Sequence, residues 1–177
     1  MFGQVAPEPA GWAWLALCLA AAAAAQAASE VLPASSATGG EAVAVKAVAE
    51  VESRVALNGR EVVKLIPADR VVPGDQVIYT LEIRNTRAVA VPPPIVAYPI
   101  PDHMRYIADS AVGPGAEVSY SIDGGRTFDR PENLKVAGPD GQPHAATAAD
   151  YTHIRWKLKH ALKGNAVAFA HFRTVVK

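Results

Sequence analysis

Every second residue from Val77 to Ile83 is large and apolar, and the residues between them are mostly polar. A period of two places these apolar side chains on one face of a β-strand, with the intervening residues on the other face. The same period recurs in residues 43–52 and 152–159, and no window shows a sustained helical period. The pattern therefore predicts an all-β chain whose strands each have one buried face.

Turn-forming residues separate the alternating segments. Asn58-Gly59 stands between two apolar runs, which is the strongest short signal for a β-hairpin, and turns are also expected at Pro73-Gly74-Asp75 and Gly113-Pro114-Gly115. The prolines within residues 92–101 favour an edge segment that crosses from one sheet to another. Residues 130–150 hold three prolines and are predicted to form a long loop.

About seven short strands separated by turns every 8–12 residues or so predict an immunoglobulin-like antiparallel β-sandwich. Its core is expected to contain Tyr79, Leu81, Ile83, Trp156 and Phe172. The Cys…Trp…Cys pattern of true immunoglobulin domains is absent, so hydrophobic packing must hold the two sheets together.

Near the C-terminus, residues 152–159 and 165–176 are interpreted as a final pair of strands, and a short strand is expected to begin at Tyr106. The register of the last strand has two alternatives. We prefer the one that sends His171 and Arg173 to solvent, because the other would bury both. The residues then placed inside are Ala168, Ala170, Phe172, Thr174 and Val176.

The N-terminus carries the features of a secretory leader. Residues 12–25 form an uncharged apolar run of about 14 residues, the length of a signal-peptide core and shorter than the roughly 20 residues that span a bilayer. Ala25-Gln26-Ala27 supplies the small residues of a cleavage site. We therefore predict a signal peptide over residues 1–27, a flexible linker over 28–41 and one sandwich domain over 42–177, with an uncleaved membrane anchor as the alternative.

Export places the mature protein in the periplasm, on the cell surface or in the medium, with no transmembrane span. The single cysteine, Cys18, lies within the leader, so the mature chain has no disulfide or thiolate chemistry. Its 17 basic and 17 acidic residues balance, which gives no electrostatic reason to expect a nucleic-acid partner. From Tyr151 onward there are only basic charges, which indicates a solvated strand face or, alternatively, a surface for an anionic lipid or polysaccharide.

Several segments resemble the bacterial "conserved repeat" domain, domain of unknown function number eleven. Residues 72–80 (VPGDQVIYT) and Arg84-Asn85-Thr86 are similar to its Pro-Gly-Asp turn, its V-x-Y-T strand and its Asn-Thr-Gly turn, although Arg87 stands where glycine is usual. Residues 98–102 are similar to its proline-bearing strand. The resemblance covers most of residues 42–177. It implies an exported or cell-surface sandwich without catalytic residues, here in one copy rather than in tandem.

Residues 121–128 (SIDGGRTF) are similar to the Asp-box hairpin of sialidases. In such a hairpin the aspartate caps backbone N–H groups, glycine supplies a positive φ and the aromatic ring packs under the loop. Because one box cannot form a propeller, we interpret it as structural, with Asp123 as the turn cap. The carboxylates that a glycosidase would need cannot be paired from the sequence; the candidates are Asp102, Asp109, Glu117, Asp129 and Glu132.

Other candidate chemistry is weaker. The five histidines show no ligand spacing, and His153 facing His171 across the last two strands would offer only two imidazoles, so no metal or cofactor is expected. An isopeptide bond between Lys46 and Asn85 is an alternative to Asn85 simply capping its turn, which we favour. No nucleophile elbow, phosphate-binding loop or dinucleotide fingerprint is present.

The sequence therefore predicts a non-enzymatic envelope or surface module that acts as a scaffold or binds an envelope protein or glycan. Its contact surfaces are expected in the loop of residues 130–150 and on the basic final strands, because loops on a rigid scaffold often carry binding. One alternative is a carbohydrate-active enzyme fragment or accessory domain. Another is a subunit that assembles by β-strand addition through residues 42–52.

Overall fold

The computed structural model describes residues 42–57, 60–113, 115–139 and 141–177. This part of the chain is all-β, as the period-two pattern predicts. The strands are β1 (Val43–Leu57), β2 (Arg60–Pro67), β3 (Gln76–Asn85), β4 (Ile95–Pro99), β5 (Met104–Tyr106), β6 (Ala116–Ser121), β7 (Lys135–Ala137), β8 (Pro143–Ala145), β9 (His153–Leu158) and β10 (Val167–Val176), with a 3₁₀ turn, η2, at Pro131–Asn133. The predicted leader, the linker and the Asn58-Gly59 pair lie outside the described residues.

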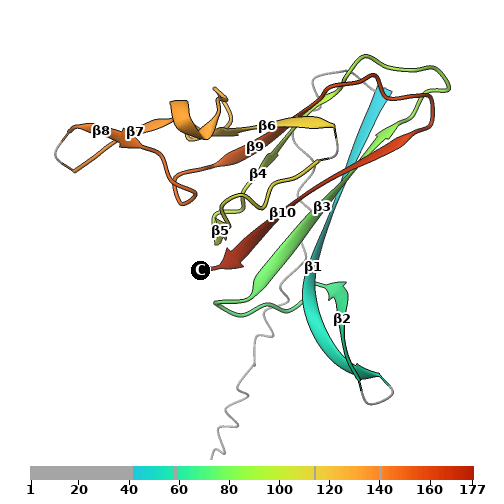
Figure 1. Ribbon diagram of the computed structural model, residues 1–177, viewed down its shortest axis with the longest axis horizontal. Coiled ribbons are helices and arrows are strands. Elements are labelled where there is room, and N and C mark those ends of the chain that lie inside the picture. Colours follow the sequence, from blue (N-terminus) through green and yellow to red (C-terminus); the bar gives the residue numbers. More distant parts are fainter. Residues whose placement is uncertain (1–41, 58–59, 114, 140) are drawn as a thin grey trace, which may run out of the picture.

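The strands form three antiparallel sheets. The largest has the order β2-β1-β3-β10-β5, the second β4-β9-β6, and the third is the hairpin β7-β8. The first two lie as layers of a sandwich, from which the β1–β2 and β7–β8 hairpins project at different ends (Figure 1). No helix in the described residues has the length and apolarity that crossing a bilayer requires.

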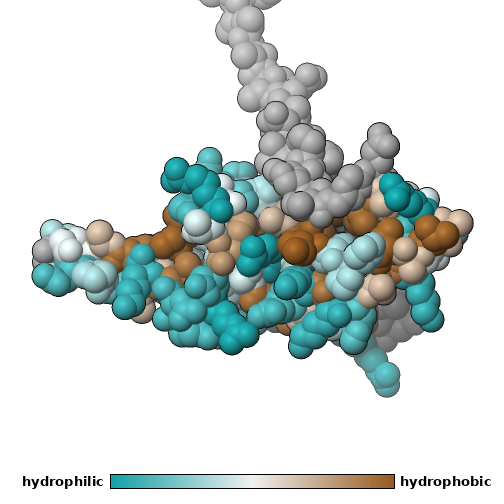
Figure 2. All heavy atoms as spheres, turned by 90° about the horizontal axis from the view of Figure 1, so that it is seen from above, coloured by the Kyte–Doolittle hydropathy of each residue, from teal (hydrophilic) through white to brown (hydrophobic). Residues whose placement is uncertain are grey.

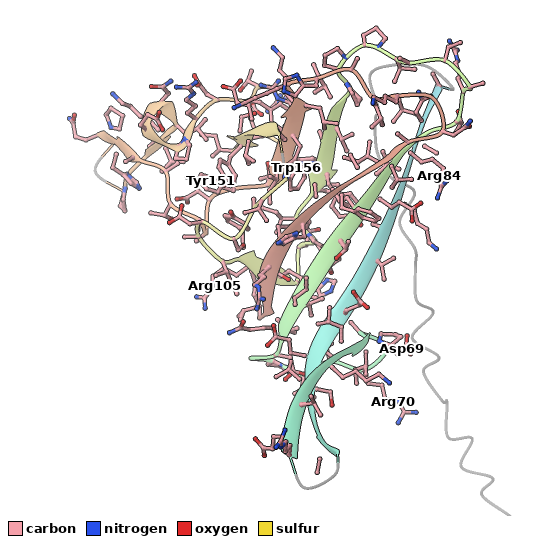
Figure 3. The ribbon with its side chains drawn as sticks, turned by 45° about the vertical axis from the view of Figure 1, so that its right-hand side comes forward. Asp69, Arg70, Arg84, Arg105, Tyr151 and Trp156 are labelled. Atoms are coloured by element: carbon pink, nitrogen blue, oxygen red, sulfur yellow. The ribbon has the colours of Figure 1, made fainter. Side chains whose placement is uncertain are left out.

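The core lies between the two larger sheets and contains all five residues predicted for it. Tyr79, Leu81, Ile83, Trp156 and Phe172 are each at most 8 % exposed. Tyr79 stacks on Phe172 with ring centroids 4.9 Å apart, and the Trp156 ring from the other sheet lies 6.0 Å from Phe172. Figure 3 shows Trp156 between the layers. Alternation along single strands therefore predicted the buried face correctly.

The preferred register of the last strand is confirmed, but its expected partner is wrong. Ala170, Phe172, Thr174 and Val176 are buried, Ala168 is half-buried, and His171 is exposed. However, β9 belongs to the three-stranded sheet and β10 to the five-stranded one, where it pairs with β3 and β5. The connection between them crosses the sandwich, and its Leu162 exchanges backbone hydrogen bonds with Val91 in the loop before β4.

Two further expectations need correction. β5 ends at Tyr106 rather than beginning there. Residues 130–150 are not a plain loop, because η2 and the β7–β8 hairpin lie within them. Leu134 anchors this segment: it is 7 % exposed, and its carbonyl accepts a hydrogen bond from the Ala146 N–H at 2.9 Å. At the end of this hairpin the Gly141 N–H donates to the Gly138 carbonyl at 2.9 Å, and Gly141 has a φ of 76°.

The strand order differs from that of an immunoglobulin constant domain. Without β2 and the β7–β8 hairpin, seven strands remain: β1, β3, β4, β5, β6, β9 and β10. In a constant domain the fifth strand lies beside the second, and the seventh beside the sixth. Here the fifth, β6, lies beside β9, and the seventh, β10, lies beside β3. The fifth and seventh strands have therefore exchanged places between the sheets.

Candidate functional site

The β1–β2 hairpin is a ribbon that extends beyond the sandwich. β1 pairs with β3 only from Val43 to Val51, and with β2 only from Glu50 to Leu57. The distal half of β1 therefore has a strand on one side alone. In Figure 1 this half curves away from the body of the molecule together with β2. The two-residue connection implied by the Leu57–Arg60 pairing agrees with the hairpin predicted at Asn58-Gly59.

All eight residues of β2 are exposed, although its sequence, REVVKLIP, is largely apolar. The exposed fractions are 42 % for Val62, 60 % for Val63, 43 % for Leu65 and 36 % for Ile66. A long, exposed, apolar edge strand is unusual in native proteins, because its free backbone groups template pairing with other chains. β2 is therefore the described segment best suited to contact another polypeptide.

The backbone hydrogen bonds of β1 alternate between its two neighbours. The Thr86 N–H donates to the Ala42 carbonyl at 3.0 Å, which places the even-numbered residues of this register against β3. The Ala68 N–H donates to the Ala49 carbonyl, also at 3.0 Å, which places the odd-numbered residues on the β2 side. By the same alternation, the even-numbered residues of β2 face β1 and its odd-numbered residues face outward.

This alternation defines two open stretches of backbone on one edge of the large sheet. The first stretch is the part of β1 that continues past the end of β2, where no described strand lies on the β2 side of β1. The second stretch is the outer edge of β2, which no described strand pairs with. The residues whose backbone groups face outward are Val43, Val45 and Ala47 in the first stretch and Glu61, Val63 and Leu65 in the second. We call these six residues the open edge.

The base of the ribbon is held to the sheet on its outer face. Arg173 of β10 forms an ion pair with Glu52 of β1 at 3.0 Å, across the end of β3. Both side chains are more than 40 % exposed, and pairs of this kind contribute about 0–1 kcal/mol. Asp69 and Arg70 lie beside the ribbon in the segment that leaves β2 (Figure 3). The ribbon is therefore fixed at one end and free along its outer strand.

The Asp-box-like hairpin has the structural role predicted for it. The Asp123 carboxylate accepts hydrogen bonds from the backbone N–H groups of Arg126 at 3.0 Å and Thr127 at 2.9 Å, and from the Thr127 hydroxyl at 2.7 Å. Gly124 and Gly125 have positive φ. These hydrogen bonds hold the pKa of Asp123 far below its usual range. The carboxylate is thus fully engaged within its own turn.

Two of the five carboxylates considered for glycoside hydrolysis, Glu117 and Asp129, are engaged in a similar way. Glu117 is paired with Arg130 at 3.0 Å, and Asp129 accepts hydrogen bonds from Asn133 and from the Arg130 N–H. These contacts lower the pKa of both carboxyl groups, and a hydrogen-bonded turn at Thr147 does the same for Asp150. A glycosidase acid needs the opposite shift. These groups are therefore poor candidates for a proton donor.

The pairing of His153 with His171, which was considered and not favoured, does not occur. His153 is on the outer face of β9 and His171 is on the outer face of β10, and these strands belong to opposite layers. His153 instead lies against Gly125 of the Asp-box-like hairpin, and its burial there lowers its pKa. Within the described residues, no group of three or more His, Cys, Asp or Glu side chains is arranged to hold a metal ion.

The Lys46–Asn85 isopeptide bond is also wrong. Asn85 pairs with Val43, whose side chain faces the core, and Asn85 is fully buried. Lys46 is three residues further along β1 and faces solvent on the opposite side of the sheet. The two side chains therefore cannot meet.

Asn85 caps its turn, as we favoured, and it also joins two distant loops. Its Oδ1 accepts a hydrogen bond from the Arg87 N–H at 2.9 Å. Its Nδ2 lies 2.8 Å from the Val89 carbonyl, 3.0 Å from the Leu162 carbonyl and 2.9 Å from the Lys163 carbonyl. Every polar group of this buried amide is thus satisfied, which gives it a structural role.

The basic residues of the C-terminal segment do not form one surface. Arg155 and Lys157 point outward from the three-stranded sheet, whereas Arg173 points outward from the opposite layer. Arg155 is held by the Ser119 hydroxyl at 3.0 Å and lies 4.6 Å from the centre of the Phe128 ring. The face seen from above in Figure 2 likewise mixes hydrophilic and hydrophobic residues. The two-layer fold divides the charge that the sequence groups together.

A tyrosine cluster near β5 was not predicted from the sequence. The hydroxyls of Tyr106 and Tyr120 lie 3.0 Å apart, and Tyr151 stacks on Tyr120 with ring centroids 4.5 Å apart. The Tyr106 hydroxyl also accepts a hydrogen bond from the Ala111 N–H. Burial, together with the Tyr106 hydroxyl, raises the pKa of Tyr120 strongly. Tyr106 and Tyr120 therefore belong to the buried core, and the half-buried Tyr151 packs against them.

No family model, curated protein or solved structure matches this chain. The candidate site therefore rests on the geometry of the open edge and of β2. Sequence reasoning assigned β2 to a hairpin but placed the contact surfaces elsewhere. The available signal was the run Val62-Val63 followed by Leu65-Ile66, which is apolar on both faces of a strand rather than on one.

Proposed function

We propose that this chain is an exported, non-enzymatic module that binds another polypeptide by β-strand addition at its open edge. The observation that carries this proposal is the complete exposure of β2, an apolar strand whose outer backbone groups meet no partner among the described residues. Added strands gain affinity from backbone hydrogen bonds and specificity from alternate side chains. The open edge offers both.

This proposal refines the alternative of assembly through residues 42–52. In that segment β1 is paired with β3 along one side, so only its other side is open, at Val43, Val45 and Ala47. The second open stretch lies on β2, which that alternative did not include. The scaffold role and the binding role are compatible, because a module that adds a strand at its edge binds that polypeptide and also holds it in place.

The proposal has two further parts, which are export of the chain and an immunoglobulin-like fold. The apolar run of residues 12–25 and the Ala25-Gln26-Ala27 site support a cleaved leader, which would place the mature chain outside the cytoplasm. The segments similar to the conserved repeat domain support an immunoglobulin-like sandwich in the broad sense. That class includes sandwiches with exchanged strand order.

Site-specific photo-crosslinking in an exporting bacterial host tests the binding mode. A photoreactive residue is placed in turn at Ala44, whose exposed side chain lies between the open-edge residues Val43 and Val45, at Val63, at Lys135 of β7 and at Lys157 of β9. We expect adducts with polypeptides from the two positions along the open edge and none from the other two. Adducts confined to Lys135 or Lys157 would overturn the proposal in favour of the surfaces predicted from the sequence.

A matched proline variant gives a second measurement. The Val45 N–H faces the open edge, so Val45→Pro removes an outward donor and leaves the β1–β3 ladder intact. Lys46→Pro removes an N–H that bonds to β3. With the photoreactive residue at Ala44, we expect Val45→Pro to abolish the adducts while preserving the fold, and Lys46→Pro to destabilise the fold. Undiminished cross-linking in folded Val45→Pro would contradict strand addition at this stretch.

A further inference from the structure

We infer that the partner of β2 is β2 of a second copy of this chain, paired antiparallel about a two-fold axis at Val63. This inference rests on the proposed function, because it names the strand that is added. The resulting dimer would join two five-stranded sheets edge to edge into one continuous sheet. A two-fold interface requires one surface patch that is complementary to itself, and the sequence of β2 meets that requirement.

Backbone geometry limits the registers that two β2 strands can adopt. Their outward-facing groups are those of Glu61, Val63 and Leu65, so only odd-numbered residues can exchange hydrogen bonds. With the axis at Val63, Val63 pairs with its own copy, and Glu61 pairs with Leu65 of the partner in both directions. All three outward residues of each copy are then satisfied.

The registers shifted by one residue of the axis in either direction are disfavoured, because they oppose like charges or use a proline that has no N–H. An axis at Lys64 places the two Lys64 side chains opposite each other and pairs Glu61 with Pro67, which has no N–H to donate. An axis at Val62 places Lys64 opposite Arg60. Like charges directly opposite each other destabilise a strand pair. The Val63 axis instead places Lys64 opposite Val62, and Arg60 opposite Ile66.

The same register covers the apolar side chains that β2 exposes. Val63 is the most exposed of the four large apolar residues of the strand, at 60 %, and the axis brings it against its own copy. On the same face, Leu65 of each copy lies diagonally beside Val63 of the other, within reach of a large side chain. The opposite face pairs Val62 with the apolar stem of Lys64. Pairing of two copies thus covers apolar side chains of β2 that are exposed to solvent in a single copy.

Engineered disulfides test the register directly, because the mature chain contains no other cysteine. In this register the two Val63 Cα atoms would lie about 5.5 Å apart, within the range that a disulfide spans. Val63→Cys is compared with Val89→Cys, a similarly exposed valine in the loop before β4. We expect Val63→Cys to oxidise to a covalent dimer at least tenfold faster than Val89→Cys. Equal rates would overturn the register.

Sedimentation velocity of the mature chain tests the dimer itself. We expect the apparent mass to double with rising protein concentration, and Val63→Lys to abolish this change while Val89→Lys does not. Val63→Pro, which removes only an outward N–H, should act as Val63→Lys does. A wild-type chain that stays monomeric at every concentration would overturn self-pairing. If adducts with other polypeptides still formed at Ala44 and Val63, strand addition would stand with a different occupant.

Discussion

The side-chain nitrogen of Asn85 donates a hydrogen bond to the carbonyl oxygen of Leu162, 77 positions away, at 3.0 Å. The same nitrogen lies against the carbonyls of Val89 and Lys163. These groups belong to the two loops that carry the chain from the large sheet to the small one and back. One buried amide therefore fixes how the two layers of the sandwich meet.

We expect Asn85→Ala to lower the free energy of unfolding by about 3 kcal/mol or more. The Val89 carbonyl and the Arg87 N–H would each lose Asn85 as their partner, at roughly 1–3 kcal/mol for each group left unsatisfied, whereas the Leu162 and Lys163 carbonyls keep backbone donors. Urea denaturation of the mature chain measures the loss. Asn133→Ala is the control, because its amide bonds an exposed carboxylate and should change stability little. Similar losses in the two variants would show that Asn85 has no special role.

The fluorescence of Trp156 measures directly whether the core is intact. The other two tryptophans, Trp12 and Trp14, lie in the predicted leader, so the mature chain has only Trp156. We expect a blue-shifted emission maximum that moves to that of exposed tryptophan on unfolding. Trp156→Ala should cost about 3–5 kcal/mol through the cavity it leaves.

Trp156→Phe should cost clearly less than Trp156→Ala. The indole Nε1 has no hydrogen-bond partner among the described residues, so phenylalanine retains much of the ring contact without losing a hydrogen bond. Equal losses for the two variants in urea denaturation would mean that the indole nitrogen is bonded after all.

The Asp123 turn should make stability depend on acid pH. Its folded-state pKa is lowered from 3.8, so its contribution is complete above that value and is lost as the pH falls below it. We expect Asp123→Asn to melt at a lower temperature than the wild type at pH 7, with the difference shrinking toward pH 2. Thermal melts across this range provide the measurement. A difference that stays constant with pH would exclude the carboxylate as the cause.

The buried tyrosines should limit stability at alkaline pH. Burial and the nearby Tyr98 raise the pKa of Tyr79 to about 12, and Tyr120 is shifted in the same direction. Because folding favours the neutral phenols, their contribution is complete below about pH 10 and is lost as the pH rises toward 12. We expect tyrosinate absorbance and loss of β-sheet circular dichroism to appear together. Ionisation of all five tyrosines near pH 10 in an intact fold would contradict this.

The predicted leader has a simple test. Expression in a secretion-competent bacterium should yield a mature chain that begins at Ala28, as measured by intact mass. Ala27→Leu replaces the small residue before the cleavage site and should leave the leader attached. A wild-type product that retains residues 1–27 would favour the uncleaved anchor.

The sequence predicted those features that depend on neighbouring residues. The buried faces of β3, β9 and β10 follow from alternation, because successive side chains of a strand point to opposite sides whatever the strand pairs with. The cap formed by Asp123 follows from local turn chemistry for the same reason. Each of these features is decided within about ten residues.

The features that were missed depend on which segments meet in space. β9 and β10 are close in sequence and each alternates well, yet a crossing loop sends them to different layers. Their outer faces therefore separate His153 from His171, and Arg155 from Arg173. The apolar run of β2 on both of its faces was a signal in the sequence, but whether those faces are covered depends on where the second layer ends.

The exchanged position of β10 has a consequence for how the molecule forms during synthesis. β10 leaves the ribosome after all the other described strands, yet it lies between β3 and β5, and its Phe172 packs against Trp156 of the other layer. The earlier strands cannot complete either the large sheet or the core without it. Nascent chains should therefore remain unfolded until β10 has been synthesised, whatever the order in which the earlier strands emerge.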